Sequence, residues 1–419
     1  MHSTGFEASR GGCPFCFIIP PQMLQRLATS GDPDLAETAG RTLRLTQSIV
    51  AFRAQLSTGA PSPAARVREG LRRQIFDCKG FTDLPGDQVR SESDTNPSRD
   101  KAVNEAFDHA GTTWDFYNKV FGRESVDNRG KTLVSSVHYG QKYDNAFWDG
   151  RQMVYGDGDG VIFQRFTAAL DVIAHELTHG VTQFSAQLAY QDQSGALNES
   201  MSDAFGSMVK QWALGQTVDQ ADWLIGAAIM APGFKGRALR DMANPGTAFD
   251  DPNLGKDSQP GHMKDYVETT SDNGGVHINS GIPNRAFVLA AKAIGGKSWE
   301  KAGKIWYVAL TERLTGNDGF EKCARETVSV ARDLFPEDSS IAAKVAKAWA
   351  DVGVLEEAPS TALLASVAGA YVIAPRVREV AVAPRPAVKT KKRAAPSAAA
   401  KAAKGSRTKK IKSGKSRAR

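Results

Sequence analysis

The stretch from Thr167 to Phe184 limits the fold most strongly, because it has the pattern of an almost uninterrupted apolar helix. His175, Glu176 and His179 interrupt this pattern. A helix that is apolar nearly all round is buried in a folded domain. Burying a glutamate and two histidines within it requires partners for their polar atoms. The chain must therefore build its core around a polar cluster.

The two histidines form the pattern H-E-x-x-H, which on an α-helix brings both imidazoles to one face. Such a pair can share a metal ion, or both rings can be satisfied by backbone carbonyls. Glu199 and Asp203 have the same spacing on a second helix, whose opposite face is apolar. One carboxylate can complete a His₂Glu site of the catalytic zinc type, and the other can orient a histidine. The competing interpretation is a solvated acidic face.

Five ordered blocks around these residues resemble the thermolysin family of zinc metalloproteases, peptidase family M4. The similarity covers about residues 70–355. It implies an α+β fold in two lobes, with a β-rich N-terminal lobe, a central active-site helix and a helical C-terminal lobe. It also implies a zinc-dependent neutral endopeptidase. The blocks are residues 145–148, 152–160, 171–182, 195–200 and 272–281.

The resemblance implies a role for each residue of the site. One catalytic Zn²⁺ is expected on His175, His179 and Glu199. Glu176 would be the general base for a water that the zinc activates. The other implied roles are Asp203 and Asn198 behind the ligand histidines, Tyr190 and His277 as donors to the oxyanion of the tetrahedral intermediate, and Asp272 as the carboxylate that orients and charges His277.

The resemblance also implies how a peptide binds. Asn145 and the backbone of Ala146 would hold it as an added strand, and Arg240 would contact a substrate carbonyl. The implied preference is for bulky apolar residues on the primed side of the cleaved bond. Four residues would line that pocket, although core packing explains each of them equally well: Phe163, Phe166, Val172 and Leu239.

Composition and resemblance together predict four segments. Residues 1–66 are a short helical propeptide and linker, in which Asp32 can cap a helix that begins at Pro33. Residues 67–190 are the β-rich lobe with the H-E-x-x-H helix, and strands should dominate from about Ile75 to Gly160. Residues 191–357 are the helical lobe, and residues 358–419 are a flexible basic tail rich in Ala and Pro. The helices expected in the second lobe are 284–294, 299–314, 320–335 and 341–352.

The N-terminal unit resembles the short propeptide of the protealysin-like branch of the family, which implies an autoinhibited precursor. The Pro/Ala/Ser-rich stretch 57–66 predicts cleavage within about residues 55–75. Cys13 and Cys16 precede the unit as C-P-F-C. A thiolate from this pair could take the open position on the zinc. The alternative is a mobile CxxC in a disordered end.

The charge of the chain is divided unevenly along its length. Of 53 Lys and Arg residues, 14 lie from Arg385 onward, so residues 1–384 hold 39 basic residues and all 46 acidic ones. The overall charge of +7 is therefore no argument that the folded region binds phosphate. Residues 385–419 are either a solvated tail or an arm that holds the enzyme on nucleic acid or another anionic surface.

The calcium sites of the family are expected to be altered. Asp171 matches a calcium-binding carboxylate, but Lys210 stands where another is expected. A lysine ammonium would repel Ca²⁺, so the double calcium site is predicted to be lost. Binding of Ca²⁺ elsewhere on the protein is still possible.

The N-terminus shows no basic region followed by an apolar run, and the longest apolar run, 361–374, is too short to span a bilayer. The resemblance implies a secreted protein, with a cytoplasmic enzyme as the alternative. We expect a monomer whose partners are peptide or protein substrates and its own propeptide. The rival function is a non-catalytic, zinc-stabilised binding protein recruited by its basic tail.

Overall fold

The computed structural model describes residues 16–54 and 69–356, apart from the side chains of residues 50–54. The chain separates into two units between Ala358 and Pro359, and the described residues belong to the first. Cys13, residues 55–68 of the expected cleavage region and the basic tail lie outside the described residues. Among the described helices, none is both long enough and apolar enough to cross a membrane.

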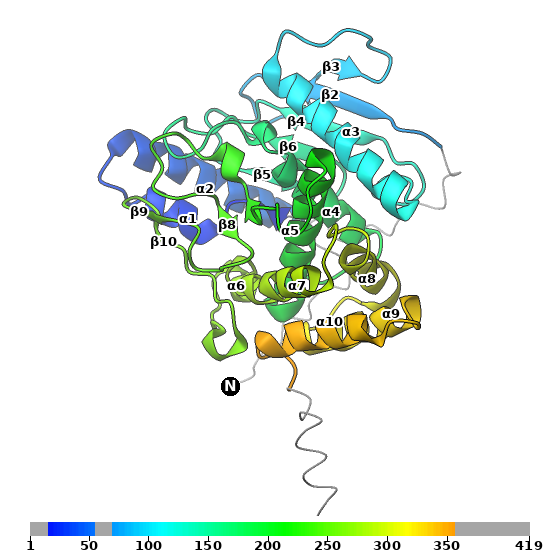
Figure 1. The fold of residues 1–419 in the computed structure, drawn as a ribbon. Helices are drawn as coiled ribbons and strands as arrows, with labels where there is room; N and C mark the ends of the chain where they lie inside the picture. Colours follow the sequence, from blue (N-terminus) through cyan, green and yellow to red (C-terminus); the bar gives the residue numbers. More distant parts are fainter. Residues whose placement is uncertain (1–15, 55–68, 357–419) are drawn as a thin grey trace, which may run out of the picture. The chain divides into compact units, whose positions relative to one another are not determined.

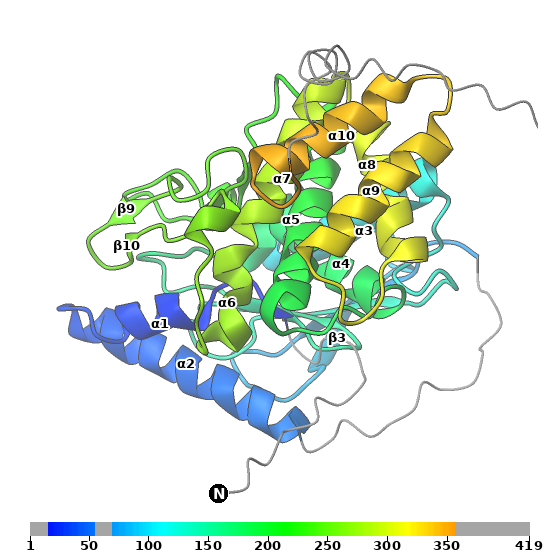
Figure 2. The same cartoon turned by 90° about the horizontal axis from the view of Figure 1, so that it is seen from below.

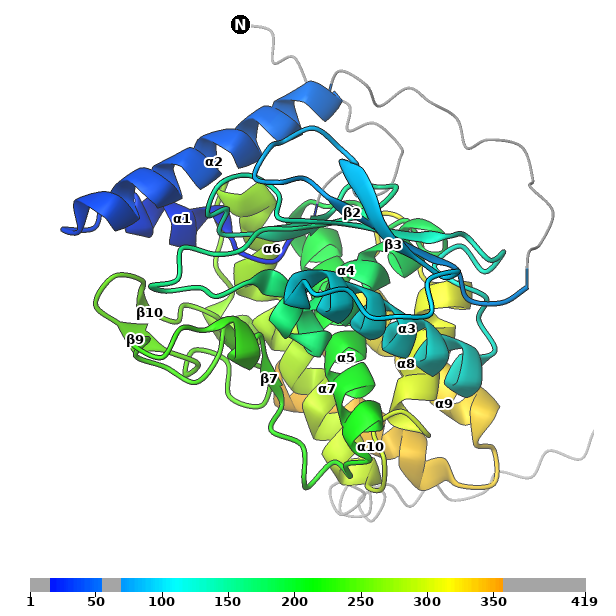
Figure 3. The ribbon, with the colours of Figure 1, turned by 90° about the horizontal axis from the view of Figure 1, so that it is seen from above.

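A six-stranded mixed sheet forms the core of the first lobe, in the order β1-β5-β6-β4-β2-β3. Figure 3 labels its strands β2 and β3. Strands β2, β4 and β6 run parallel, whereas β1, β5 and β3 join antiparallel to their neighbours. The N-terminal strand β1 is therefore an edge strand added to β5. The bounds are β1 Cys16–Phe17, β2 Arg73–Asp77, β3 Asp87–Ser91, β4 Leu133–Val137, β5 Ala146–Trp148 and β6 Met153–Tyr155.

The prediction that strands dominate from Ile75 to Gly160 is wrong, because helix α3 (Lys101–Phe121) occupies a quarter of this region. Asp100 caps its first turn by accepting hydrogen bonds from Ala102 N and Val103 N. Gly122 ends the helix in the left-handed conformation. Both signals are visible in the sequence, and the Gly, Asp and Asn residues around them obscured the helix.

His138 joins the cap of α3 to the sheet and should make stability depend on pH. Its ring nitrogens lie 2.9 Å from carboxylate oxygens of Asp100 and Asp157. The hydrogen bond to Asp157 is the main cause that raises the pKa of His138 to about 9. A raised pKa stabilises the fold fully below the ordinary value of 6.5, and this stabilisation is lost as the pH rises through about 9.

We therefore expect His138→Gln to lower the free energy of unfolding by about 2 kcal/mol near pH ~6 and by much less above pH ~9. Urea unfolding of the Glu176→Gln precursor, which cannot process itself, would measure this at both pH values. Asp157→Asn is the control and should reduce the same pH dependence. An equal loss of stability at both pH values would contradict the prediction.

Helices α4 (Leu170–Gln183) and α5 (Asp192–Leu214) pack against each other at the centre of the molecule (Figure 1). Gly206 of α5 permits this close approach. A Cβ atom at this position would lie 2.6 Å from Asp171 O and 3.3 Å from His175 N. The missing side chain thus lets α5 bring its own polar residues next to the H-E-x-x-H segment of α4.

The four helices predicted in the second lobe are confirmed. The second, predicted at 299–314, differs in detail, because α8 begins at Ala302 and continues as a π-helical turn, η4 (Ala309–Arg313). The remaining short elements are β7 Leu224–Ile225, β8 Arg240–Asp241, β9 Asp250–Asp251 and β10 Gly255–Lys256. The helices of this lobe are α6 Asp272–Asn279, α7 Gly281–Ile294, α8 Ala302–Val308, α9 Phe320–Leu334 and α10 Ser339–Asp351.

The predicted N-terminal helical unit consists of α1 (Pro21–Leu27) and α2 (Pro33–Ala54), which lie along one side of the fold (Figure 2). Asp32 caps α2 as predicted, since its Oδ1 accepts from the backbone of residues 34 and 35. The unit is bound to both lobes. Arg26 donates to Leu254 O at 2.9 Å, and Thr46 Oγ1 lies 2.9 Å from Tyr143 Oη.

Candidate active site

The two histidines of α4 are fully buried and face each other. Their Nε2 atoms are 3.0 Å apart, and their rings are nearly perpendicular, at 83°. Two imidazole nitrogens on one tetrahedral zinc ion would be about 3.3 Å apart, given Zn–N bonds of about 2.0 Å. The spacing between His175 and His179 therefore suits two ligands of one metal ion.

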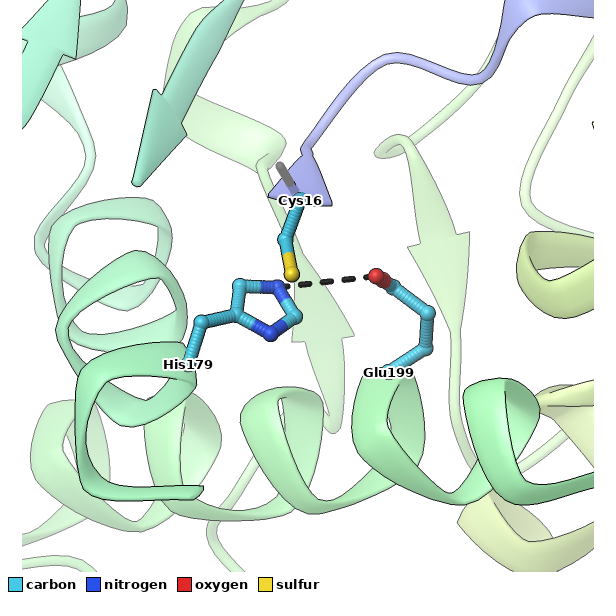
Figure 4. Close-up of side chains that lie close together, drawn as sticks. All are labelled: Cys16, His179 and Glu199. Atoms are coloured by element: carbon cyan, nitrogen blue, oxygen red, sulfur yellow. Dashed lines mark ion pairs between the residues drawn. The ribbon is translucent and has the colours of Figure 1, made fainter. Parts of the chain in front are cut away.

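Glu199 of α5 approaches both histidines. Its Oε2 is 3.4 Å from His175 Nε2, and its Oε1 is 3.5 Å from His179 Nε2. Figure 4 shows this carboxylate facing the His179 ring. Glu199 Oε2 is buried without a hydrogen-bond partner, which is costly for a carboxylate oxygen unless a cation neutralises it. These three side chains thus fit a zinc ion by donor type, spacing and unmet charge.

The other ring nitrogen of each histidine is held by α5. His175 Nδ1–H donates to Asp203 Oδ1 at 2.8 Å, and His179 Nδ1–H donates to Asn198 Oδ1 at 2.9 Å. Protonation at Nδ1 leaves the Nε2 lone pairs for a metal. Ser202 Oγ lies 3.1 Å from His179 Nδ1 and was missed by sequence reasoning, although its i+4 spacing from Asn198 could have indicated it.

Asp203 is the centre of a buried network. Arg240 donates to both of its oxygens at 2.8 Å, and Asn284 Nδ2 donates to Oδ2 at 2.8 Å. Burial raises the pKa of Asp203, but Arg240 and His175 more than offset this and lower it to about 2. Asp203 is therefore ionised. No spacing along the chain indicates the contacts with Arg240 and Asn284, because these residues lie far from Asp203 in the sequence and on other elements.

Glu176 lies on the sheet side of the histidine pair. Its Oε2 accepts a hydrogen bond from Trp148 N of β5 at 2.9 Å, and its Oε1 is buried without a partner. Burial raises the pKa of Glu176 well above its ordinary value. A carboxylate that is poorly solvated and has a free oxygen beside a metal site is a strong base.

The predicted tight turn before His277 is confirmed. Asn273, Gly274 and Gly275 have φ angles of 50°, 83° and 74° at the start of α6. A Cβ atom on Gly274 would lie 2.0 Å from Asp192 Oδ1, so glycine is required there for space as well as for φ. This turn places the His277 ring close to Glu199, with its Nε2 3.6 Å from Glu199 Oε1.

The contacts of His277 hold it as a charged donor. Its Nδ1–H donates to Asp272 Oδ1 at 2.7 Å, and its Nε2 lies 3.1 Å from Tyr190 Oη. Burial lowers the pKa of His277, but Asp272 and Glu199 outweigh burial and raise it to about 9. Tyr190 donates to Glu199 Oε1. The structure thus brings His277, Asp272 and Tyr190 together with Glu199, beside the two histidines of α4.

The residues expected to bind substrate instead hold the chain's own N-terminal segment. Ile18 N donates to Ala146 O at 3.1 Å, and Ile18 O accepts from Arg240 Nη1 at 3.2 Å. Ile19 N donates to Asn145 Oδ1 at 2.9 Å, and Asn145 Nδ2 donates back to Ile19 O at 3.1 Å. The segment is therefore bound antiparallel to β5, as an added peptide strand would be.

The carbonyl of Phe17, the residue before Ile18, faces His277. Phe17 O accepts a hydrogen bond from His277 Nε2 at 2.7 Å. The four apolar residues expected to line a primed-side pocket are almost fully buried, in the same hydrophobic cluster as Ile18. They are Phe163, Phe166, Val172 and Leu239.

Lys210 fills the place where a calcium-binding carboxylate was expected. Its Nζ lies 3.1 Å from Asp171 Oδ2 and 2.9 Å from Asp222 Oδ1. It also donates to Leu224 O at 2.6 Å. An ammonium group therefore neutralises the carboxylates of this site.

A buried His₂Glu cluster with a second buried glutamate beside it, between a mixed sheet and a helical lobe, is typical of a metallopeptidase. The family model of the thermolysin metallopeptidase catalytic domain matches residues 54–183, and that of its alpha-helical domain matches residues 186–354. The chain belongs to the thermolysin family, in its protealysin-like branch. It is a thermolysin-like metalloendopeptidase, and its family implies zinc.

Two relatives and one solved structure support this assignment. The chain is 52% identical over 344 residues to the extracellular metalloprotease of Pectobacterium carotovorum subsp. carotovorum, which covers 81% of this chain and 97% of the relative. It is 45% identical over 342 residues to protease PrtS of Photorhabdus sp., covering 80% and 91%. The precursor of protealysin from Serratia proteamaculans is 50% identical and has a TM-score of 0.73, covering 81% of this chain and 100% of that one.

Proposed function

We propose that the mature protein hydrolyses internal peptide bonds, with Glu176 as the general base. The observation that carries this proposal is the substrate-like binding of residues 17–19, whose backbone engages every group expected to hold a peptide. A backbone bound in this way places the carbonyl of Phe17 beside His277 and near the metal-binding residues. A peptide substrate would follow the same path once the N-terminal segment has left.

The chemistry divides among the residues of the site. His175, His179 and Glu199 would hold zinc, which when bound makes water more acidic and polarises a carbonyl. Glu176 would accept the proton of the attacking water and deliver it to the departing amine. Tyr190 and the charged His277 would donate hydrogen bonds to the oxyanion, and Asp272 would keep His277 oriented.

Substrate preference would come from the apolar residues that the resemblance places at the first primed position. Ile18 follows the carbonyl that faces His277, so its side chain occupies the first primed position. We propose that Phe163, Phe166, Val172 and Leu239 form the wall of the pocket for this position, with a preference for bulky apolar residues. Arg240 would contact the carbonyl of the same residue, as it does with Ile18.

These contacts support an N-terminal segment that covers the site, and we propose the following domain organisation. Residues 1–66 would form a propeptide and linker that cover the peptide-binding edge. Residues 67–190 and 191–357 would form the two catalytic lobes, followed by the tail 358–419. Cleavage within about residues 55–75 would allow β1, α1 and α2 to dissociate.

We propose that the bound N-terminal segment inhibits the precursor, and Ile18→Asp should release this inhibition. An aspartate in the buried position of Ile18 would have no partner for its charge, so the segment should leave the site. We expect the uncleaved variant to hydrolyse a fluorogenic peptide at a rate close to that of the mature enzyme. Gln25→Asp, on an exposed position of α1, is the control and should remain latent. A latent Ile18→Asp precursor would contradict the proposed autoinhibition.

We propose that the double calcium site is replaced by Lys210. The melting temperature of the mature enzyme should then be unchanged by calcium or by a calcium-selective chelator. Lys210→Met should lower the free energy of unfolding by about 2 kcal/mol, because it leaves the buried Asp171 without its cation. Lys119→Met removes an exposed pair and should have little effect. A calcium-dependent rise in the melting temperature of the wild type would refute the replacement.

We propose that the enzyme is exported, since relatives bear the name extracellular metalloprotease. Fractionation of native cells and culture fluid with an antibody to the mature domain distinguishes export from a cytoplasmic enzyme. We also propose that residues 385–419 hold the enzyme on nucleic acid or another anionic surface, and that the enzyme is a monomer. Binding through the tail should weaken steeply with salt and vanish when the tail is deleted.

Casein hydrolysis tests the proposed function directly. The mature enzyme should lose activity with a zinc chelator and regain it when zinc is restored. The rival, a non-catalytic zinc-stabilised binding protein, predicts no hydrolysis at any stage. Hydrolysis that survives chelation would point to a contaminant and count against the proposal.

A further inference from the structure

Cys16 lies inside the site that the N-terminal segment covers. It is fully buried on β1, opposite Trp148 of β5. Its Sγ and one ligand atom each of His179 and Glu199 lie within 4.8 Å of one another. Figure 4 shows the sulfur pointing from β1 toward the gap between these two side chains. The cysteine therefore points toward the proposed metal position.

Two carboxylate oxygens in this region lack a protein partner. Glu199 Oε2 and Glu176 Oε1 are both buried without a hydrogen bond. A metal ion would satisfy Glu199 Oε2, and a tetrahedral metal ion with three protein ligands has one position left. In an active enzyme of this class that position holds water. Among the described residues, Cys16 Sγ lies close enough to ligand atoms of His179 and Glu199 to fill it.

The backbone register gives such a block a function. The peptide bond between Phe17 and Ile18 is held as a substrate would be, with its carbonyl on His277 and the next carbonyl on Arg240. This register presents the bond to the site in the way that a substrate would present its own. Excluding the attacking water would protect it, and Cys16, one residue before Phe17, places its sulfur beside His179 and Glu199.

The oxidation state of Cys16 determines whether it can bind a metal. Cys16 is disulfide-bonded, whereas Cys78 and Cys323 are free and buried. The sequence has four cysteines, so the remaining candidate partner is Cys13, which lies outside the described residues. A thiolate is a strong zinc ligand, but a disulfide sulfur is neutral and binds zinc poorly.

We propose that the reduced Cys16 thiolate is the fourth zinc ligand of the precursor, and that a disulfide between Cys13 and Cys16 removes it. The inference rests on the proposed zinc site. It makes latency strongest where thiols are kept reduced and weaker in an oxidising medium, which couples activation to export.

The redox step is a thiol–disulfide exchange. A dithiol reductant transfers two electrons and two protons to the disulfide, the S–S bond breaks, and the dithiol becomes a cyclic disulfide. Cys16 then loses its thiol proton to solvent as its sulfur binds the metal. The reverse reaction needs a disulfide oxidant, which accepts the two electrons.

Cobalt spectroscopy of the full-length precursor tests the proposal. Co²⁺ replaces zinc in the Glu176→Gln background, where the precursor cannot process itself. A thiolate ligand adds an intense near-ultraviolet charge-transfer band, which histidine and carboxylate ligands do not produce. We expect this band after reduction with a phosphine and its absence before reduction. Cys13→Ser should show the band without reductant, and Cys16→Ser should never show it.

The outcomes separate this inference from the proposed function. Bound Co²⁺ with no thiolate band in the reduced precursor would overturn the inference and leave the zinc site intact. A band that persists in Cys16→Ser would also overturn it. Failure of both the Glu176→Gln precursor and its Cys16→Ser variant to bind Co²⁺ would overturn the metal site itself, and the inference with it.

Discussion

Replacing Glu176 with glutamine should lower kcat/KM of the mature enzyme for peptide hydrolysis by about 10³-fold while leaving its zinc content unchanged. Glutamine keeps the size of the side chain, and its amide oxygen can still accept the hydrogen bond from Trp148 N. It cannot accept the proton of the attacking water, which is the essential loss. Glu176 is not one of the three residues proposed to hold the metal, so metal binding should survive. Peptide hydrolysis assays together with metal analysis on the same preparation measure both quantities.

Glu321→Gln is a matched control, because it makes the same chemical change on an exposed face of α9. Its activity should equal that of the wild type. Because Glu176→Gln should be unable to process itself, the variant needs to be matured by added wild-type enzyme that is later removed. A variant that retains most of its activity would exclude Glu176 as the general base, and one that loses zinc would reassign it to metal binding.

Asp203→Ala should lower the free energy of unfolding by about 3–5 kcal/mol, the largest stability effect expected at the site. The change leaves Arg240, which is only 3% exposed, without its counter-ion, and it removes the hydrogen bonds to His175 and Asn284. Zinc affinity should also fall, by about 10- to 100-fold, because His175 loses the carboxylate that orients it. Urea unfolding with and without zinc separates the two effects.

Arg325→Ala is the control for this experiment. Arg325 pairs with Glu321 at 2.6 Å, but both side chains are 66% exposed, so the loss should stay below about 1 kcal/mol. Asp203→Asn keeps a similar shape and should be less damaging to packing than Asp203→Ala. If Asp203→Ala were as stable as the wild type in the absence of zinc, the buried network would not depend on the charge of Asp203.

Much of the site could be predicted where its residues lie within one helix or one turn. The spacing of His175 and His179, and that of Glu199 and Asp203, places each pair on one helical face. The turn before His277 follows from two glycines that tolerate positive φ. In contrast, α3 was missed although Asp100 and Gly122 mark its ends, because local composition was given more weight than capping.

The contacts between distant segments could not be predicted from the residues alone. Arg240 was expected to touch substrate, but its pairing with Asp203 depends on how β8 meets α5. The position of Cys16 beside His179 depends on β1 joining the sheet edge at β5. The spacing of residues along the chain does not predict which distant segment will pair with β5 as an added strand.

The sequence by itself determined the local geometry of this protein: two helices with facing polar pairs, a capped N-terminal unit and a glycine turn. It also carried the motif blocks that relate the chain to its family. Only the tertiary structure decided that the N-terminal segment lies in the peptide-binding edge and that a cysteine sulfur points at the proposed metal ligands. The physical reason is that hydrogen bonds and periodicity within one element depend on near neighbours in the chain, whereas these contacts arise from packing between elements more than a hundred residues apart.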